Sequence, residues 1–80
     1  MARPPVRILG VDTSLRSTGI AVIESDGVSS RAIQYGTLRN PASRDTPACL
    51  RHLFEGVTAF VRETRPTVCA IEGIFYCRNV

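Results

Sequence analysis

Hydrophobic and polar residues along the first half of the chain follow the pattern of three β-strands. The run 6–12 is mostly apolar and ends on Asp12, which is typical of a central strand covered on both faces. A β-branched run follows over 18–24, and the run 29–38 alternates more loosely after the turn Ser25-Asp26-Gly27. Short polar turns separate the three runs and predict antiparallel pairing.

The pattern changes to a helical period after the loop 40–45. Thr46 supplies a hydroxyl that can cap a helix, and Pro47 follows at the first helical position. Arg65-Pro66 ends the helix, because the residue before a proline is pushed out of the α region. Apolar residues at intervals of three, four and seven predict one face against the sheet, formed by Leu50, Leu53, Phe54, Val57, Phe60 and Val61.

A short apolar run over 67–72 follows the helix and again ends on a carboxylate, Glu72. Because a helix connects it to the preceding strands, we expect it to run parallel to the strand 6–12. The element order is therefore β-β-β-α-β, an α/β fold with a mixed sheet. We expect one small domain over 1–80, with 1–5 as a flexible N-terminal arm.

Composition excludes several classes of protein. A hydrophobic share of 44% is typical of a globular chain rather than a disordered one. No apolar stretch reaches the roughly 20 residues of a membrane span or follows the N-terminus as in a signal peptide, so we expect a cytoplasmic protein. All ten basic residues are arginine, and the net charge of +3 is compatible with a polyanionic partner without identifying one.

The three cysteines and the one histidine do not form a metal-binding pattern. Cys49, Cys69 and Cys77 are odd in number and lack CxxC spacing, which favours buried or idle thiols over a disulfide or a zinc site. His52 lies inside the predicted helix, away from the strand ends, and is expected at the boundary of the helix face.

Asp12 and Glu72 are the residues most open to a chemical role. Each ends an apolar strand, and in a parallel pair both would emerge at the same edge of the sheet, where strands lie about 4.8 Å apart. Two carboxylates at about 5 Å repel by roughly 3 kcal/mol at an effective dielectric of about 20. A hard cation such as Mg²⁺ bound between them makes the electrostatic energy of the site favourable. The alternative is structural, because a carboxylate at a strand end is often a cap or turn former.

Two segments together resemble the RuvC family of Holliday junction resolvases, which have a ribonuclease H-like fold. They are ILGVDTSLRSTG (8–19) and AIEGIFYCRN (70–79), and the resemblance runs from Arg7 through nearly the whole chain. It implies a DNA endonuclease of recombination and repair that resolves four-way junctions with Mg²⁺, for which Mn²⁺ can substitute. In the family the acids matching Asp12 and Glu72 are catalytic metal ligands.

The same resemblance assigns DNA contacts to three residues and implies protein partners. Phe75 matches an aromatic that stacks on bases at the junction, against the alternative of a core aromatic. Arg78 and Asn79 match a pair that lies against the DNA backbone, against the alternative of a solvated surface pair. Family members act as homodimers, matching the two-fold symmetry of the junction, and with branch-migration helicases.

The chain departs from the family pattern in two places. Thr13-Ser14 stands where the family has Pro-Gly, so the turn that aims Asp12 is expected to differ. The family's C-terminal strand and helices, including the helix that carries two further acids, have no counterpart among these 80 residues. We therefore expect the strand that ends at Glu72 to be an unpaired edge, and the isolated chain to dimerise, aggregate or stay partly unfolded and to be inactive.

Two other functions stay open at this point. Actin-like kinases and the tRNA threonylcarbamoylation proteins share the fold, and their first strand also ends in Asp-Thr-Ser or Asp-Gly-Thr, where the loop binds nucleotide phosphates. The segment Ala70-Ile71-Glu72 with its aromatic tail favours the resolvase family over them. A truncated remnant that binds DNA without cutting it is the non-enzymatic alternative.

Overall fold

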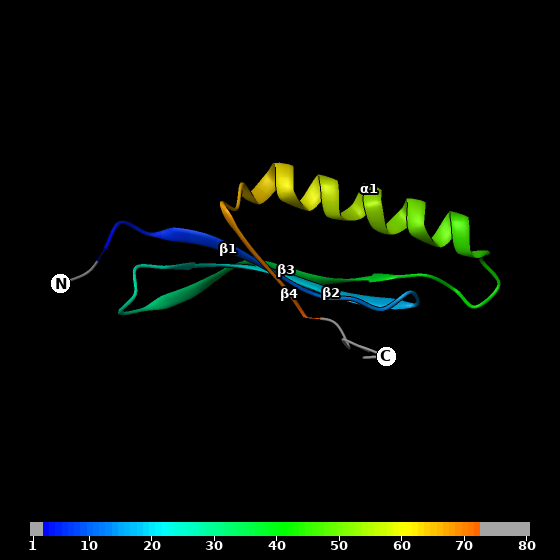
Figure 1. Ribbon diagram of the computed structural model, residues 1–80, viewed down its shortest axis with the longest axis horizontal. Coiled ribbons are helices and arrows are strands. Elements are labelled where there is room, and N and C mark those ends of the chain that lie inside the picture. The colour runs from blue at the N-terminus through cyan, green and yellow to red at the C-terminus, as the bar shows by residue number, and fades with distance from the viewer. Residues whose placement is uncertain (1–2, 73–80) are drawn as a thin grey trace, which may run out of the picture.

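The computed structural model describes residues 3–72, which form a four-stranded sheet and one long helix (Figure 1). In chain order the elements are β1 (Val6–Asp12), β2 (Ser17–Ser25), β3 (Ser30–Arg39), α1 (Thr46–Thr64) and β4 (Val68–Glu72). The predicted β-β-β-α-β order is confirmed, and the strand ends differ from the predicted ones by at most one residue. Among the described residues, no helix is both long enough and apolar enough to cross a membrane.

The sheet is mixed, and its strands lie in the order β3-β2-β1-β4. β1 pairs antiparallel with β2 and parallel with β4, and β2 pairs antiparallel with β3. α1 lies over one face of the sheet and connects β3 to β4 (Figure 1). This helical crossover makes the β1–β4 pair parallel, as the sequence predicts. Within residues 3–72, β4 is an edge of the sheet, as expected.

The core lies between α1 and the two central strands. Alternate residues of β1 and β2 point toward the helix, and the buried cluster consists of Leu9, Val11, Ile20, Val22 and Phe60. Each such side chain contributes about 1.5–3 kcal/mol when fully buried. The five side chains together therefore contribute more to the free energy of unfolding than any single polar contact in the fold.

A β-bulge explains why the third strand alternates only loosely in sequence. Val22 pairs with Gln34, whereas the next residue, Ile23, pairs with Ala32, so Ile33 is an extra residue in β3. Ile33 packs against the core although it has no partner in the register. The bulge shifts the side-chain alternation of β3 by one position, and Tyr35 is consequently exposed.

The prediction that Thr46 caps the helix is wrong, because Asp45 is the capping residue. The backbone of Asp45 is extended (φ −70°, ψ 163°), and its carboxylate accepts a hydrogen bond of 2.9 Å from the backbone N–H of Ala48. Thr46 is already the first helical residue. An aspartate one position earlier reaches the free N–H groups of the first turn, so the threonine hydroxyl is not needed.

The predicted helix face is only partly correct. Phe60 is buried as expected, and Val57 and Val61 pack against the core. Leu50 and Phe54 are not buried, because they are 56% and 72% exposed and line an open groove beside Val11.

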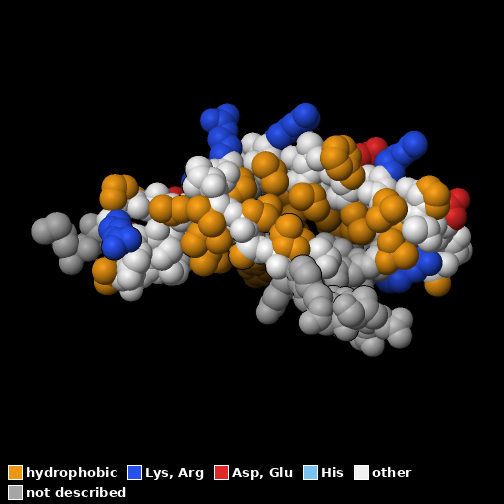
Figure 2. Space-filling view, in the orientation of Figure 1, with side chains coloured by type: hydrophobic (Ala, Val, Ile, Leu, Met, Phe, Trp, Pro, Cys, Tyr) orange, Lys and Arg blue, Asp and Glu red, His pale blue; other side chains and the backbone are white. Residues whose placement is uncertain are grey.

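Close packing at one glycine shows which stripe of the helix lies nearest the sheet. A Cβ added to Gly56 would lie 2.7 Å from Cδ2 of Leu38, so the helix backbone closely approaches β3 at this point. The stripe through Cys49, Gly56 and Phe60 therefore packs most closely on the sheet, and the neighbouring stripe with Leu50 and Phe54 lines the open groove. Figure 2 shows hydrophobic side chains exposed along the side of the molecule between α1 and the strands.

The helix ends at Thr64, as the following Arg65-Pro66 predicts. Arg65 takes the left-handed conformation (φ 49°), and its N–H donates to the carbonyl of Val61 over 2.8 Å. The guanidinium of Arg7 donates to the carbonyl of Thr64 over 2.7 Å and so joins the helix end to β1.

Candidate metal centre

Asp12 and Glu72 end two neighbouring parallel strands at the same level. In the register of β1 and β4 their Cα atoms are direct partners, and adjacent strands lie about 4.8 Å apart. Leu9 and Val11 belong to the core beneath α1, so Asp12, which alternates with them along β1, lies on the opposite face of the sheet. The side chain of Asp12 is exposed. The structure therefore brings together the two predicted acids.

Residues with small side chains surround this edge, which sequence reasoning did not identify. Gly10 pairs with Ala21 on one side and Ala70 on the other, and Gly19 is the partner of Asp12 on β2. A shallow depression of about 600 Å³ lies over these residues. The available signal was glycine in otherwise β-branched strands, which weakens a strand and often marks a close approach of another group.

The donor set at this edge fits a magnesium ion. Mg²⁺ takes oxygen ligands, keeps several of its waters, and is commonly bound through one or two carboxylates together with substrate phosphates. Asp12 is accessible from solvent, and a Cβ on Gly19 would lie 3.7 Å from the Asp12 Cβ, so glycine keeps this neighbouring position free of side-chain atoms. Across residues 3–72, no three His, Cys, Asp or Glu side chains form a larger metal-binding group.

The loop that follows Asp12 is held by hydrogen bonds at consecutive residues. Thr18, which is buried, donates its hydroxyl to the carbonyl of Ser14 over 2.6 Å and accepts from the Ser14 N–H over 3.2 Å. Asn40, also buried, donates its side-chain amide to the carbonyl of Leu15 over 2.8 Å. The turn after Asp12 is thus ordered without the proline and glycine of the family pattern.

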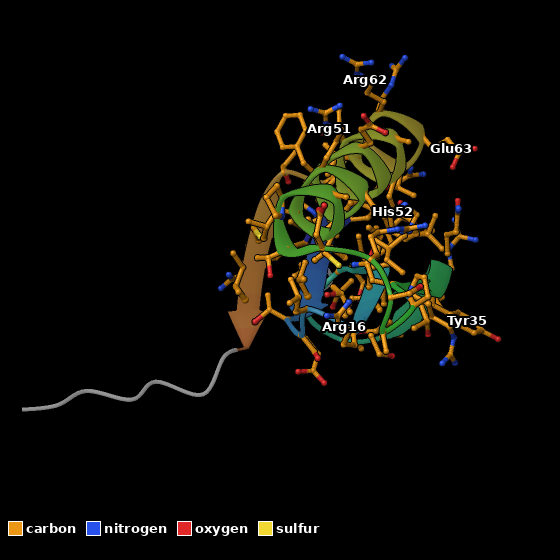
Figure 3. All side chains as sticks on the ribbon, turned by 90° about the vertical axis from the view of Figure 1, so that its right-hand side faces the viewer. Arg16, Tyr35, Arg51, His52, Arg62 and Glu63 are labelled. Atoms are coloured by element: carbon orange, nitrogen blue, oxygen red, sulfur yellow. The ribbon has the colours of Figure 1, made fainter. Side chains whose placement is uncertain are left out.

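The remaining candidate residues divide between described and undescribed parts of the chain. Phe75, Arg78 and Asn79 lie outside the described residues, so their predicted DNA contacts stay predictions. His52 is half-buried on α1, at the boundary of the face as expected (Figure 3). Cys49 is a buried thiol, whereas Cys69 is exposed on β4.

Comparison with solved structures defines the class of fold as ribonuclease H-like. The Thermus thermophilus RuvC structure superposes with a TM-score of 0.77 at 19% identity, covering 94% of this chain and 48% of that one. The structure of T. thermophilus RuvC in complex with a Holliday junction substrate gives 0.82 at 17% identity, covering 92% and 46%. The predicted fold is confirmed.

Sequence comparison then identifies the family. The family model for crossover junction endodeoxyribonuclease RuvC matches residues 8–80, and the chain belongs to this family. The RuvC protein of Treponema pallidum is 37% identical over 73 residues, covering 91% of this chain and 37% of that protein. The RuvC of Cupriavidus pinatubonensis is 40% identical over 70 residues, with coverage of 88% and 39%.

The match covers only part of each relative. The RuvC of Brevibacillus brevis, for example, is 31% identical over 94% of this chain but only 45% of its own length. The chain thus spans less than half the length of these curated relatives. Family membership decides against the nucleotide-binding alternative.

Proposed function

We propose that this chain forms the first part of the nuclease domain of an endonuclease that resolves Holliday junctions in DNA recombination and repair. The observation that carries the proposal is the register partnership of Asp12 and Glu72 at the ends of β1 and β4. Membership of the RuvC family supports it, as does the fold shared with a RuvC whose structure holds a Holliday junction substrate.

Asp12 and Glu72 would together hold Mg²⁺, or Mn²⁺ in its place. A cation held there would supply activation of water for phosphodiester hydrolysis, with a second Mg²⁺ needed to stabilise the leaving oxygen. Without a cation, two carboxylates about 5 Å apart repel by roughly 3 kcal/mol, so the pair favours cation binding. The small residues Gly10, Gly19 and Ala70 leave the sheet surface beside the acids open to a bulky polyanion.

The proposal extends to contacts and partners that the fold alone does not define. Phe75 would stack on an unpaired base, and Arg78 and Asn79 would contact the DNA backbone. A homodimer would match the two-fold symmetry of a four-way junction. A branch-migration helicase is the proposed partner, and the cytoplasm is the proposed site of action.

The test is nicking of a synthetic four-way junction by the protein as its gene encodes it, including any residues that follow Val80. We expect cleavage only with Mg²⁺ or Mn²⁺. Asp12→Asn and Glu72→Gln should each lower the cleavage rate at least about 100-fold, because several kcal/mol of metal-dependent stabilisation is lost. Both variants should keep junction binding in a gel-shift assay.

A matched control separates loss of the site from loss of any acid. Glu55 is an exposed carboxylate on α1, and Glu55→Gln should leave the cleavage rate unchanged. Undiminished cutting by Asp12→Asn or Glu72→Gln would contradict the metal-site assignment. Salt-sensitive junction binding without any cleavage by the unmodified protein would instead indicate a non-catalytic family member.

A further inference from the structure

The side chain of Arg16 joins the loop after Asp12 to two other segments. Its Nη1 atom donates to the carbonyls of Pro41 (2.7 Å) and Arg44 (3.0 Å) and lies 3.2 Å from the Sγ atom of Cys49. Figure 3 views this end of the molecule and places Arg16 beneath the first turn of α1, between the helix and the strands. One guanidinium thus connects the β1–β2 loop, the β3–α1 loop and the start of the helix.

Backbone and amide contacts reinforce the same junction. The N–H of Asn40 donates to the carbonyl of Arg16 over 3.0 Å, and the side chain of Arg44 donates to Oδ1 of Asn40 over 2.7 Å. Asn40 is only 5% exposed and Cys49 is fully buried, so these contacts anchor on the packed interior. A residue in such a network has little freedom to move independently.

We propose that Arg16 is a positioning residue for Asp12. The inference rests on the proposed function, since it treats Asp12 as a metal ligand. Only the short loop over 13–16 separates Asp12 from β2, so displacement of the loop changes the path of the chain directly after the metal ligand. In this chain Arg16 fixes the turn that has Thr13-Ser14 where the family has Pro-Gly.

Arg7 offers a matched control at the opposite end of β1. Its guanidinium donates to the carbonyl of Thr64 over 2.7 Å, so it fastens the end of α1 much as Arg16 fastens the start. Arg7 lies five positions before Asp12 in the same strand and pairs with Glu24, not with the site. If Arg16 contributed only to stability, the two arginine variants would have the same effect on metal binding.

The experiment measures Mn²⁺ binding without DNA, by electron paramagnetic resonance of the free ion, on the protein as its gene encodes it. Arg16→Met should weaken Mn²⁺ binding by up to about tenfold, the lower end of the loss found for residues that contact a metal ligand directly, because Arg16 acts on Asp12 only through the loop. Arg16→Lys should weaken it less, because an ammonium group can still donate to one of the loop carbonyls. Arg7→Met should leave it unchanged. Circular dichroism is used first to find a temperature at which every variant is folded, and Mn²⁺ binding is measured at that temperature.

A second measurement follows the Mg²⁺ concentration that gives half-maximal nicking, which should rise for Arg16→Met and not for Arg7→Met. If Arg16→Met does not fold, Arg16→Lys carries the comparison. Mn²⁺ binding by the unmodified protein together with equal effects of the Arg16 and Arg7 variants would overturn the positioning role and leave the proposed function intact. Absence of Mn²⁺ binding by the unmodified protein would overturn both.

Discussion

Glu24 lies between two arginine side chains on the sheet. Nε of Arg7 is 3.1 Å from one carboxylate oxygen and Nη2 of Arg31 is 3.2 Å from the other. These two hydrogen bonds hold the pKa of Glu24 below its ordinary value of 4.5, and the one from Arg7 has the larger effect. The folded protein therefore keeps this carboxylate ionised at a pH where the unfolded chain begins to bind a proton.

Stability should consequently depend on pH through Glu24. Its contribution is fully present above about pH 4.5 and is lost as the pH falls through the lowered pKa, because protonation ends the charge pairing. Urea unfolding of the protein and of Glu24→Gln, from pH 6 down to pH 3, should show a difference in unfolding free energy that shrinks with falling pH. Added salt should reduce the difference at pH 6, since the pair is accessible to solvent. A pH-independent difference would contradict this role.

At the scale of one element, the start of α1 gives a prediction that distinguishes two neighbouring residues. Asp45→Ala removes the acceptor for the Ala48 N–H and should lower the free energy of unfolding by about 1 kcal/mol. Thr46→Ala should change it by less than about 0.5 kcal/mol, because Thr46 is an exposed residue inside the first turn. Urea denaturation of both variants provides the measurement, and a larger effect of Thr46→Ala would restore the cap expected from sequence.

The elements differ in how well the sequence predicts them. The strands and the helix were predictable because their apolar spacing matches the period of each element. Asp45 and Thr46 are both good capping residues, so the sequence could not decide between them. The stripe of α1 that packs most closely is set by the approach of Gly56 to Leu38, and the bulge at Ile33 by how β3 pairs with β2. Both are tertiary contacts that a local pattern does not contain.

At the scale of the whole molecule, the paired acids were predictable and the network that supports them was not. Asp12 and Glu72 each end an apolar run, and the helical crossover makes their strands parallel, so their meeting follows from topology. The contacts of Arg16 with Pro41 and Cys49 join residues 25 and 33 positions apart. Such pairings arise from the folding of loops and have no periodic signature in sequence.

Two phenylalanines on α1 test how the core is distributed over the molecule. Phe60 is 8% exposed and belongs to the buried cluster, whereas Phe54 is 72% exposed. Phe60→Ala should cost about 3–5 kcal/mol of unfolding free energy, which is a large share of the stability of a small domain. Phe54→Ala should cost less than about 1 kcal/mol. Similar losses in thermal unfolding experiments would show that the helix face is assigned wrongly.

Exposed apolar side chains should also control the association of the 80-residue chain with itself. Leu50, Phe54 and Ile71 are each more than half exposed, and a groove of about 540 Å³ lies beside α1 between Leu50, Phe54 and Leu15. Apolar surface of this kind promotes association.

Sedimentation velocity of the chain should therefore show a sedimentation coefficient that rises with concentration. The double variant Leu50→Gln with Phe54→Gln should reduce this rise without loss of helix content. Tyr35→Gln is the control, because Tyr35 is exposed on β3, outside the groove. A purely monomeric chain at every concentration, or equal effects of the groove and control variants, would rule out this surface as the cause of association.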